Sequence, residues 1–344
     1  MSKKKRLNVG VIGTGMGRGH ILGYQRIPGV KVVGVVDVDE KRGKAVAKEQ
    51  KIPNSFTTHE ELLAQKDLDA VSIATPNVYH TPIAIDAIKA GLHVLCEKPM
   101  ATTAADAKKI LKAADKADTV FMMAFNNRYR GDSQLLSQYI EAGELGEIYY
   151  GRCGWVRRRG VPGMGGWFTQ KKLSGGGPLI DIGVHALDLT WWLMGCPVPQ
   201  VAMGGVYHDL AKQEWERQGK PGKMDIEDLG VGMIRFENGA TLVLEASWVL
   251  HTPNERFYSE VMGSKGGASL EPEFKVYQER YGELVDLTPR PPSVNGHEGE
   301  VAHFIECIRT GKQPISTATH GYHVMQMLDA IYESGRIGRE VVIQ

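Results

Sequence analysis

The chain has 344 residues, of which 42% are hydrophobic and 24% charged, and its formal net charge is +1. A chain of this length exceeds the size at which one hydrophobic core keeps growing, so we expect two domains. The small net charge gives no long-range field for nucleic acid or an anionic bilayer, and no apolar run reaches the roughly 18 residues of a membrane helix. We therefore expect a folded protein that binds neither nucleic acid nor membranes.

Cysteine usage and the N-terminal residues indicate the compartment. Cys96, Cys153, Cys196 and Cys307 are scattered without CxxC pairs in a chain much larger than a disulfide scaffold. The N-terminus carries basic residues but lacks the apolar stretch and the cleavage site of a signal peptide. These features predict a cytoplasmic protein.

Residues 1–125 alternate short β-branched runs with helical patterns, which is typical of βαβ units and a parallel sheet. The predicted strands are Leu7 to Ile12, Val32 to Val36, Ala70 to Ala74, Val94 to Cys96 and Val120 to Ala124. The predicted helices lie near 19–27, 39–50, 59–65, 80–90 and 104–117. We predict an N-terminal Rossmann dinucleotide-binding domain over 1–125.

Residues 126–344 have a different pattern and predict a C-terminal α+β domain with a large, mostly antiparallel sheet, for substrate binding and oligomerisation. Turns at Asn238-Gly239 and Gly263 to Gly267 indicate antiparallel hairpins. The other predicted elements are helices near 132–142, 181–194, 301–308 and 322–332, a strand over 147–158 and a glycine-rich segment over 160–177. The fold class is therefore α/β with two domains.

A glycine turn follows the first predicted strand in VGVIGTGMGRGH. Gly13 allows a tight turn, and Gly15 lets the backbone approach a pyrophosphate at a helix N-terminus. Arg18 stands where the third glycine of GxGxxG is expected, so helix packing needs a local adjustment there. The turn predicts dinucleotide contacts from Gly13, Gly15, Met16 and Gly17, with a plain tight turn as the alternative.

Asp37 ends the second predicted strand, 22 residues after Gly15, close to the spacing of a ribose-binding acid. Its carboxylate is expected to accept both ribose hydroxyls and to repel a 2′-phosphate, which favours NAD. NADP remains an alternative if Asp37 turns away and Lys41 and Arg42 receive the phosphate.

Four further motifs have a recognisable order along nearly the whole chain. They are TPNVYH from Thr75, CEKPMA from Cys96, FNNRYR from Phe125 and GGGPLIDIGVHALDL from Gly175. Together with the glycine turn they resemble the Gfo/Idh/MocA family of sugar and inositol dehydrogenases. The resemblance implies cofactor contacts from Thr75, Asn77, His80, Glu97, Lys98 and Asn126. For His80 a capping or packing role is the alternative, and for Glu97 and Lys98 a surface ion pair.

The resemblance also implies the catalytic groups. His185 is expected to be the acid/base, Lys98 the cation that polarises the substrate oxygen, and Asp181 the residue that holds the histidine or a substrate hydroxyl. Asp181 and His185 are four residues apart, so on a helix they share one face. The alternatives are that Asp181 caps its helix, or that Asp181, His185 and Asp188 bind a metal; we expect no metal.

Substrate contacts are expected from the domain junction and from the strand and loop before the catalytic helix. The expected residues are Arg128, Tyr129, Trp155, Arg157, Trp167, Asp181 and His185. Aromatic faces there would stack on sugar carbons. The alternative is that these tryptophans pack in the core and that Arg157 and Arg159 serve a subunit contact.

The sequence thus predicts an NAD(P)-dependent dehydrogenase acting on a secondary hydroxyl of a sugar, inositol or sugar derivative. A redox-neutral glycosidase that uses tightly bound NAD for oxidation and elimination is the second hypothesis, and a dinucleotide-sensing protein without turnover the third. The resemblance suggests a homodimer or homotetramer joined through the open face of the C-terminal sheet. The pattern does not specify the substrate or the oxidised carbon.

Overall fold

The computed structural model describes residues 6–219 and 222–344, which fold into two compact units. The first unit comprises residues up to Ala101, Ala105–Asn126 and Asn295–Tyr322. The second comprises Thr102–Ala104, Asn127–Val294 and His323–Gln344. The expected boundary lies within two residues of the observed one, but we expected residues 295–322 in the second domain. They belong to the first because helix α10 (Gly296–Thr310) packs on α1 (Gly17–Gln25), where Gly23 leaves room for Val301.

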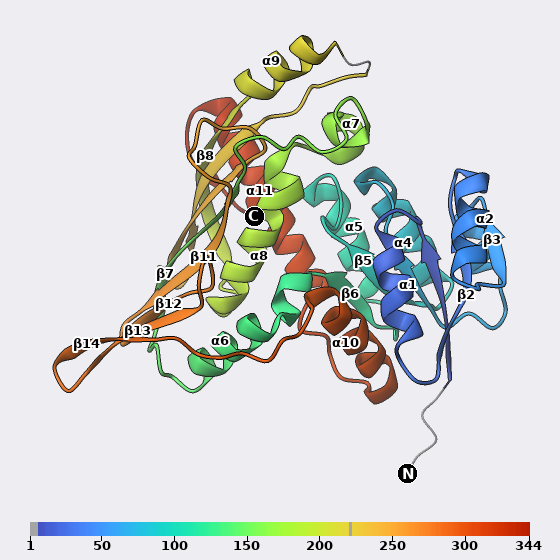
Figure 1. The fold of residues 1–344 in the computed structure, drawn as a ribbon, viewed down its shortest axis with the longest axis horizontal. Coiled ribbons are helices and arrows are strands. Elements are labelled where there is room, and N and C mark those ends of the chain that lie inside the picture. Colours follow the sequence, from blue (N-terminus) through green and yellow to red (C-terminus); the bar gives the residue numbers. More distant parts are fainter. Residues whose placement is uncertain (1–5, 220–221) are drawn as a thin grey trace. The chain divides into compact units, whose positions relative to one another are not determined.

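The first unit contains a parallel sheet whose described strands follow the order β3-β2-β1-β4-β5-β6 (Figure 1). The strands are β1 (Leu7–Ile12), β2 (Val30–Val36), β3 (Asn54–Phe56), β4 (Ala70–Ile73), β5 (His93–Glu97) and β6 (Phe121–Ala124). The helices include α2 (Glu40–Glu49), α3 (His59–Leu63), α4 (His80–Lys89), α5 (Ala104–Ala114) and the short η1 (Asn77–Tyr79) and η2 (Asn126–Tyr129). The order reverses between β1 and β4, which confirms the Rossmann prediction and places ligand-binding loops at the carboxyl ends of the strands. The three-residue β3 was not predicted.

The second unit contains a sheet whose described strands follow the order β14-β13-β12-β11-β7-β10-β9-β8-β15. The strands are β7 (Ile148–Val156), β8 (Pro199–Tyr207), β9 (Leu229–Phe236), β10 (Thr241–Ser247), β11 (Arg256–Gly263), β12 (Gly266–Ser269), β13 (Lys275–Arg280), β14 (Glu283–Leu287) and β15 (Val341–Val342). Neighbours pair antiparallel except β7 and β10, which pair parallel. The predicted hairpins at Asn238-Gly239 and Gly263 to Gly267 are both present.

The π-helical η4 (Leu179–Gly183), α8 (Val184–Leu193) and α11 (Ala318–Ile337) pack on strands of this sheet. The unit also contains α6 (Gly131–Glu141), η3 (Trp167–Thr169), α7 (Lys171–Ser174) and α9 (Asp209–Gln218). Helix α8 packs on β7, β10 and β11, where Gly151 allows close approach of Thr190 and Met194. Helix α9 was not predicted, because its sequence is polar. No helix in the described part of the chain is long and apolar enough to span a membrane.

Candidate active site

The glycine turn joins β1 to α1. Gly13 has φ +95°, and a Cβ there would lie 2.3 Å from the carbonyl oxygen of Ala74. A Cβ at Gly17 would lie 2.6 Å from Val11 Cγ1, so Gly17 supplies the close helix–strand contact that the third glycine of GxGxxG provides. A Cβ at Gly15 would meet no described atom within 4 Å, so its backbone faces open space. The turn is therefore built for close approach despite Arg18.

Asp37 follows β2 and is buried. Its Oδ1 accepts a hydrogen bond from Arg42 Nη2 at 2.6 Å, and its Oδ2 accepts from Arg42 Nε at 2.8 Å and from the Thr14 hydroxyl. Burial opposes ionisation of Asp37, but the bonds from Arg42 and Thr14 outweigh it and lower its pKa to about 2. The expected carboxylate is thus in place. It pairs with Arg42, which was expected to bind a 2′-phosphate only if Asp37 turned away.

The polar residues after β4 differ in whether their side chains have hydrogen-bond partners within the protein. Thr75 Oγ1 is buried and has no hydrogen-bond partner among the described residues. Asn77 is buried in η1. His80 is fully buried, with Nδ1 2.7 Å from the Pro99 carbonyl and Nε2 2.9 Å from the Thr75 carbonyl. Burial lowers the pKa of His80 despite these acceptors. Both ring nitrogens face backbone carbonyls, so His80 joins the loops after β4 and β5, in line with the packing alternative, and its cofactor contact stays a prediction.

Glu97 ends β5 and is buried, so it does not form a surface ion pair with Lys98. One carboxylate oxygen accepts from the Lys98 backbone N–H at 3.1 Å, and the other lies 3.1 Å from His20 Nε2. Burial opposes ionisation, but the His20 hydrogen bond and the charges of His20 and Lys98 lower the pKa of Glu97. Lys98 itself is half-buried and precedes a cis peptide bond to Pro99. The structure thus presents a cation beside a buried carboxylate at the carboxyl end of the sheet.

Asn126 begins η2, directly after the neighbouring strand β6. Its Nδ2 donates to His297 Nε2 at 3.3 Å, whereas its buried Oδ1 has no partner in the residues described. Buried polar atoms are normally hydrogen-bonded, so such atoms at strand ends indicate a ligand. The orphaned oxygens of Thr75 and Asn126, with the open backbone at Gly15, fit a dinucleotide.

The second unit holds the other expected catalytic residues. Asp181 lies in η4 and His185 in α8, and within the stretch 179–191 these two are half-buried while every other residue is buried. Trp248 Nε1 donates to Asp181 Oδ2 at 3.2 Å. The π-helical turn was not predicted; such turns are frequent at functional sites. Asp181 and His185 are thus the accessible polar groups of a buried helix.

An aromatic and charged group lies beside His185. The Trp155 ring is 5.9 Å from the His185 ring and 5.4 Å from that of Phe257. The Arg157 guanidinium lies 4.9 Å above the Trp155 ring, and Trp155 Nε1 and Arg157 Nε both reach Glu255 Oε1, at 3.2 and 3.4 Å. Trp155 therefore lies next to His185 and is held in place by Arg157, Phe257 and Glu255.

Two of the residues expected to contact the substrate are buried. Arg128 is fully buried, and Asp188 accepts from its Nε at 2.9 Å and its Nη2 at 2.6 Å. Tyr129 is also buried. The first helical turn after the junction points into the core, and the substrate contacts expected of both residues stay predictions. The pairing also removes Asp188 from any metal site with His185. Trp167 is half-buried and stacks on Phe168 with ring centroids 3.8 Å apart.

Sequence reasoning missed the residue that positions the start of the helix carrying Asp181 and His185. Glu227 is buried and accepts from the backbone N–H groups of Gly177 at 2.8 Å and Leu179 at 3.2 Å, and from the Tyr332 hydroxyl at 2.7 Å. Burial raises its pKa. A Cβ at Gly177 would lie 2.1 Å from the Glu227 carbonyl oxygen, which explains the glycine run before the helix. The glycine run was the available signal, but it did not identify the partner.

These features define an NAD-binding oxidoreductase, and comparison with known proteins agrees. Residues 7–125 match the family model described as "Oxidoreductase family, NAD-binding Rossmann fold", and residues 137–343 match its "C-terminal alpha/beta domain". The chain belongs to the Gfo/Idh/MocA oxidoreductase family, as its motifs predict.

Several relatives are similar over most of their length. The chain is 32% identical to D-glucoside 3-dehydrogenase of Escherichia coli (strain K12), covering 97% of both chains. It is 31% identical to levoglucosan dehydrogenase of Pseudarthrobacter phenanthrenivorans, covering 76% of this chain and 73% of that one. A solved structure of levoglucosan dehydrogenase with NADH and L-sorbose aligns with a TM-score of 0.87 at 27% identity, covering 99% of each chain. The protein is therefore a nicotinamide-dependent oxidoreductase.

Proposed function

We propose that the protein oxidises a secondary hydroxyl of a sugar or sugar derivative. The observation that carries this proposal is the half-buried pair Asp181 and His185, with the His185 ring 5.9 Å from the ring of Trp155. A sugar ring presents hydroxyls on its rim and C–H groups on its face, which match a polar pair next to an indole. The names of the relatives, D-glucoside 3-dehydrogenase and levoglucosan dehydrogenase, support a sugar over an inositol.

The proposed roles follow from the chemistry of alcohol oxidation. His185 takes the hydroxyl proton, Lys98 polarises the same oxygen, and Asp181, held by Trp248, orients the imidazole or a neighbouring hydroxyl. The nicotinamide, when bound, accepts the hydride. In this proposal Trp155, Arg157 and Trp167 contact the sugar.

For the cofactor we propose contacts from the turn residues, from the orphaned oxygens of Thr75 and Asn126, and from Asn77, Glu97 and Lys98. Asp37 keeps its negative charge throughout the physiological range, because its pKa is lowered to about 2. A carboxylate there repels a 2′-phosphate. We therefore propose NAD as the preferred cofactor.

The deciding experiment is a panel of glycosides, aldoses and inositols assayed for NADH absorbance with the purified protein. We expect NADH to form with a sugar, and His185→Gln to lower kcat at least roughly a hundredfold, as for a lost acid/base group. His208→Gln, which changes an exposed histidine of the same unit, is the control and should have no effect. Substrate consumption without net NADH would favour the redox-neutral glycosidase, and no turnover with any substrate would favour a dinucleotide sensor.

We also propose that two copies associate through the uncovered face of the second unit's sheet. Met203 and Met233 face each other on β8 and β9 and are 51% and 49% exposed, and Val243 continues the row on β10. An exposed apolar row on a sheet is typical of an interface. Light scattering should give a dimer or tetramer that Met233→Glu dissociates, whereas Leu284→Glu on β14 should not. A monomeric wild-type protein would contradict this.

The described cysteines are all free, which supports a cytoplasmic location, since reducing compartments keep thiols unpaired. Fractionation of the source cells tests this point.

A further inference from the structure

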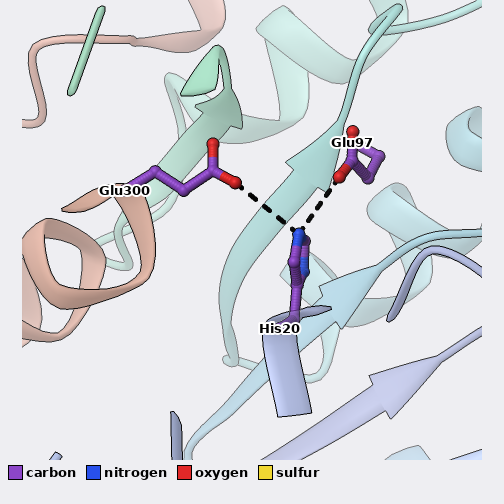
Figure 2. A group of neighbouring side chains, drawn as sticks. All are labelled: His20, Glu97 and Glu300. Atoms are coloured by element: carbon purple, nitrogen blue, oxygen red, sulfur yellow. Dashed lines mark hydrogen bonds and ion pairs between the residues drawn. The ribbon is translucent and has the colours of Figure 1, made fainter. Parts of the chain in front are cut away.

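A row of buried titratable side chains begins at Glu97 in the first unit (Figure 2). His20 on α1 lies between two carboxylates: its Nε2 is 3.1 Å from Glu97 Oε1 and 3.8 Å from Glu300 Oε1 on α10. His297 Nδ1, one helical turn before Glu300, lies 3.1 Å from the same Glu300 oxygen. The side chains of His20, Glu97 and Glu300 are at most 9% exposed, whereas that of His297 is 43% exposed. The row of side chains therefore extends from Glu97, at the end of β5, to the partly exposed imidazole of His297.

The hydrogen bonds fix where protons sit. Asn126 Nδ2 donates to His297 Nε2, so the hydrogen of a neutral His297 is on Nδ1 and is donated to Glu300. The His20 imidazolium donates from Nε2 to Glu97. Because this one nitrogen faces both carboxylates, it can bond either of them but only one at a time. Its Nδ1, Glu300 Oε2 and Asn126 Oδ1 are buried without partners among the described residues, which leaves room for protonation changes.

The charges around the cluster favour a proton on His20. Burial opposes it, but the hydrogen bond and charge of Glu97 raise the pKa of His20. Burial and the Glu97 charge raise the pKa of Glu300. Other titratable groups that interact with the cluster are Tyr24 on α1, Cys96 and Lys98 on the β5 segment and His80 on α4. The charge of Lys98, the proposed catalytic lysine, affects the pKa of both Glu97 and His297.

We propose that His20, Glu300 and His297 form a proton relay that keeps Glu97 ionised beside Lys98 and exchanges protons with solvent. His20 is in this view a positioning residue: its imidazolium is the counter-charge that holds the Glu97 carboxylate, and Glu97 in turn fixes the Lys98 backbone N–H. This inference rests on the proposed role of Lys98.

An inward proton would move through the relay in two transfers. A hydronium ion protonates His297 at Nε2 and leaves as water, the Nδ1–H bond of His297 breaks as an O–H bond forms on Glu300, and that proton then passes to the unprotonated Nε2 of a neutral His20 whose own hydrogen is on Nδ1. One proton enters at His297, and one proton is held on His20 as its imidazolium. His297 finishes neutral with its hydrogen on Nε2, which the free Oδ1 of Asn126 can accept after rotation of the amide.

The test compares His20→Gln, which keeps an N–H donor near Glu97 but cannot be protonated, with the wild-type protein. Histidine NMR titration without cofactor or sugar should show a resonance that titrates above pH ~6.5 in the wild type and is missing in His20→Gln. In the same variant kcat should fall roughly tenfold, as for one lost charged hydrogen bond. The acid limb of its kcat profile should also move, while the sugar KM stays unchanged.

His59→Gln is the matched control, because His59 also pairs with a carboxylate, Asp86, at 3.2 Å in the same unit. If His20→Gln fails to fold, His297→Gln at the exposed end replaces it and should shift the same acid limb. Unchanged profiles in the folded variants would overturn the relay. A stoichiometric divalent metal in the purified protein would overturn it too, because His20, Glu97 and Glu300 are close enough to bind one. The titration needs no sugar, so its outcome is independent of the proposed substrate.

Discussion

The indole nitrogen of Trp248 donates a hydrogen bond to Asp181 Oδ2 across 3.2 Å. Trp248 is fully buried directly after β10, so its ring cannot follow the carboxylate if that moves. Asp181, by contrast, is half-buried at the π-helical turn. The sheet thus fixes one oxygen of the proposed catalytic carboxylate.

Trp248→Phe should weaken catalysis more than stability. The substitution keeps most of the ring but removes the donor, and a hydrogen bond to a charged group is worth ~1.5–3 kcal/mol. We expect kcat/KM to fall roughly tenfold or more, measured by NADH formation. Trp191→Phe is the control, because Trp191 is equally buried and donates to the Pro197 carbonyl at 2.8 Å. Equal activity losses in both variants would show that the effect is only structural.

The sequence predicts much of this site because the relevant spacing is local. Asp181 and His185 are four residues apart, and helical geometry alone places them on one face. Arg128 and Asp188 are 60 residues apart, so nothing local indicates that the arginine is buried with a carboxylate partner. The same holds for Glu227 and for Glu300, which reach the glycine run and His20 only through the tertiary fold. Local spacing indicates which residues of one motif lie together, whereas partners far apart in the sequence required the structure.

Arg128→Met should destabilise the protein strongly, although its position in the FNNRYR motif suggested a substrate role. The change leaves the Asp188 carboxylate buried without its partner, which costs ~3–5 kcal/mol. Urea unfolding should show the loss, and the double variant Arg128→Met/Asp188→Leu should recover most of it. A variant that folds normally but has a raised sugar KM would instead restore the substrate role.

Asp37→Ser should broaden cofactor use. Removing the carboxylate ends the repulsion of a 2′-phosphate and frees Arg42, which now donates twice to Asp37. We expect the ratio of kcat/KM for NAD over NADP to fall at least roughly tenfold, since one charge contact is worth ~1.4 kcal/mol or more. Asp39→Ser is the control: Asp39 caps α2 through the Arg42 backbone, so its loss affects the helix and leaves cofactor preference unchanged. If both variants keep the wild-type ratio, Asp37 does not face the ribose.

Asp37 should also give a defined pH dependence of stability. Its pKa is 3.8 in the ordinary state and about 2 in the folded protein. A carboxylate with a lowered folded pKa stabilises the native state above its unfolded pKa and loses that contribution as the pH falls through the folded value. The free energy of unfolding of the wild type should therefore exceed that of Asp37→Asn by a constant amount above pH ~5, and the difference should shrink between pH ~4 and ~2. Urea unfolding at several pH values measures this difference. A gap that stays constant down to pH ~3 would mean that packing of Asp37, rather than its charge, stabilises the end of β2.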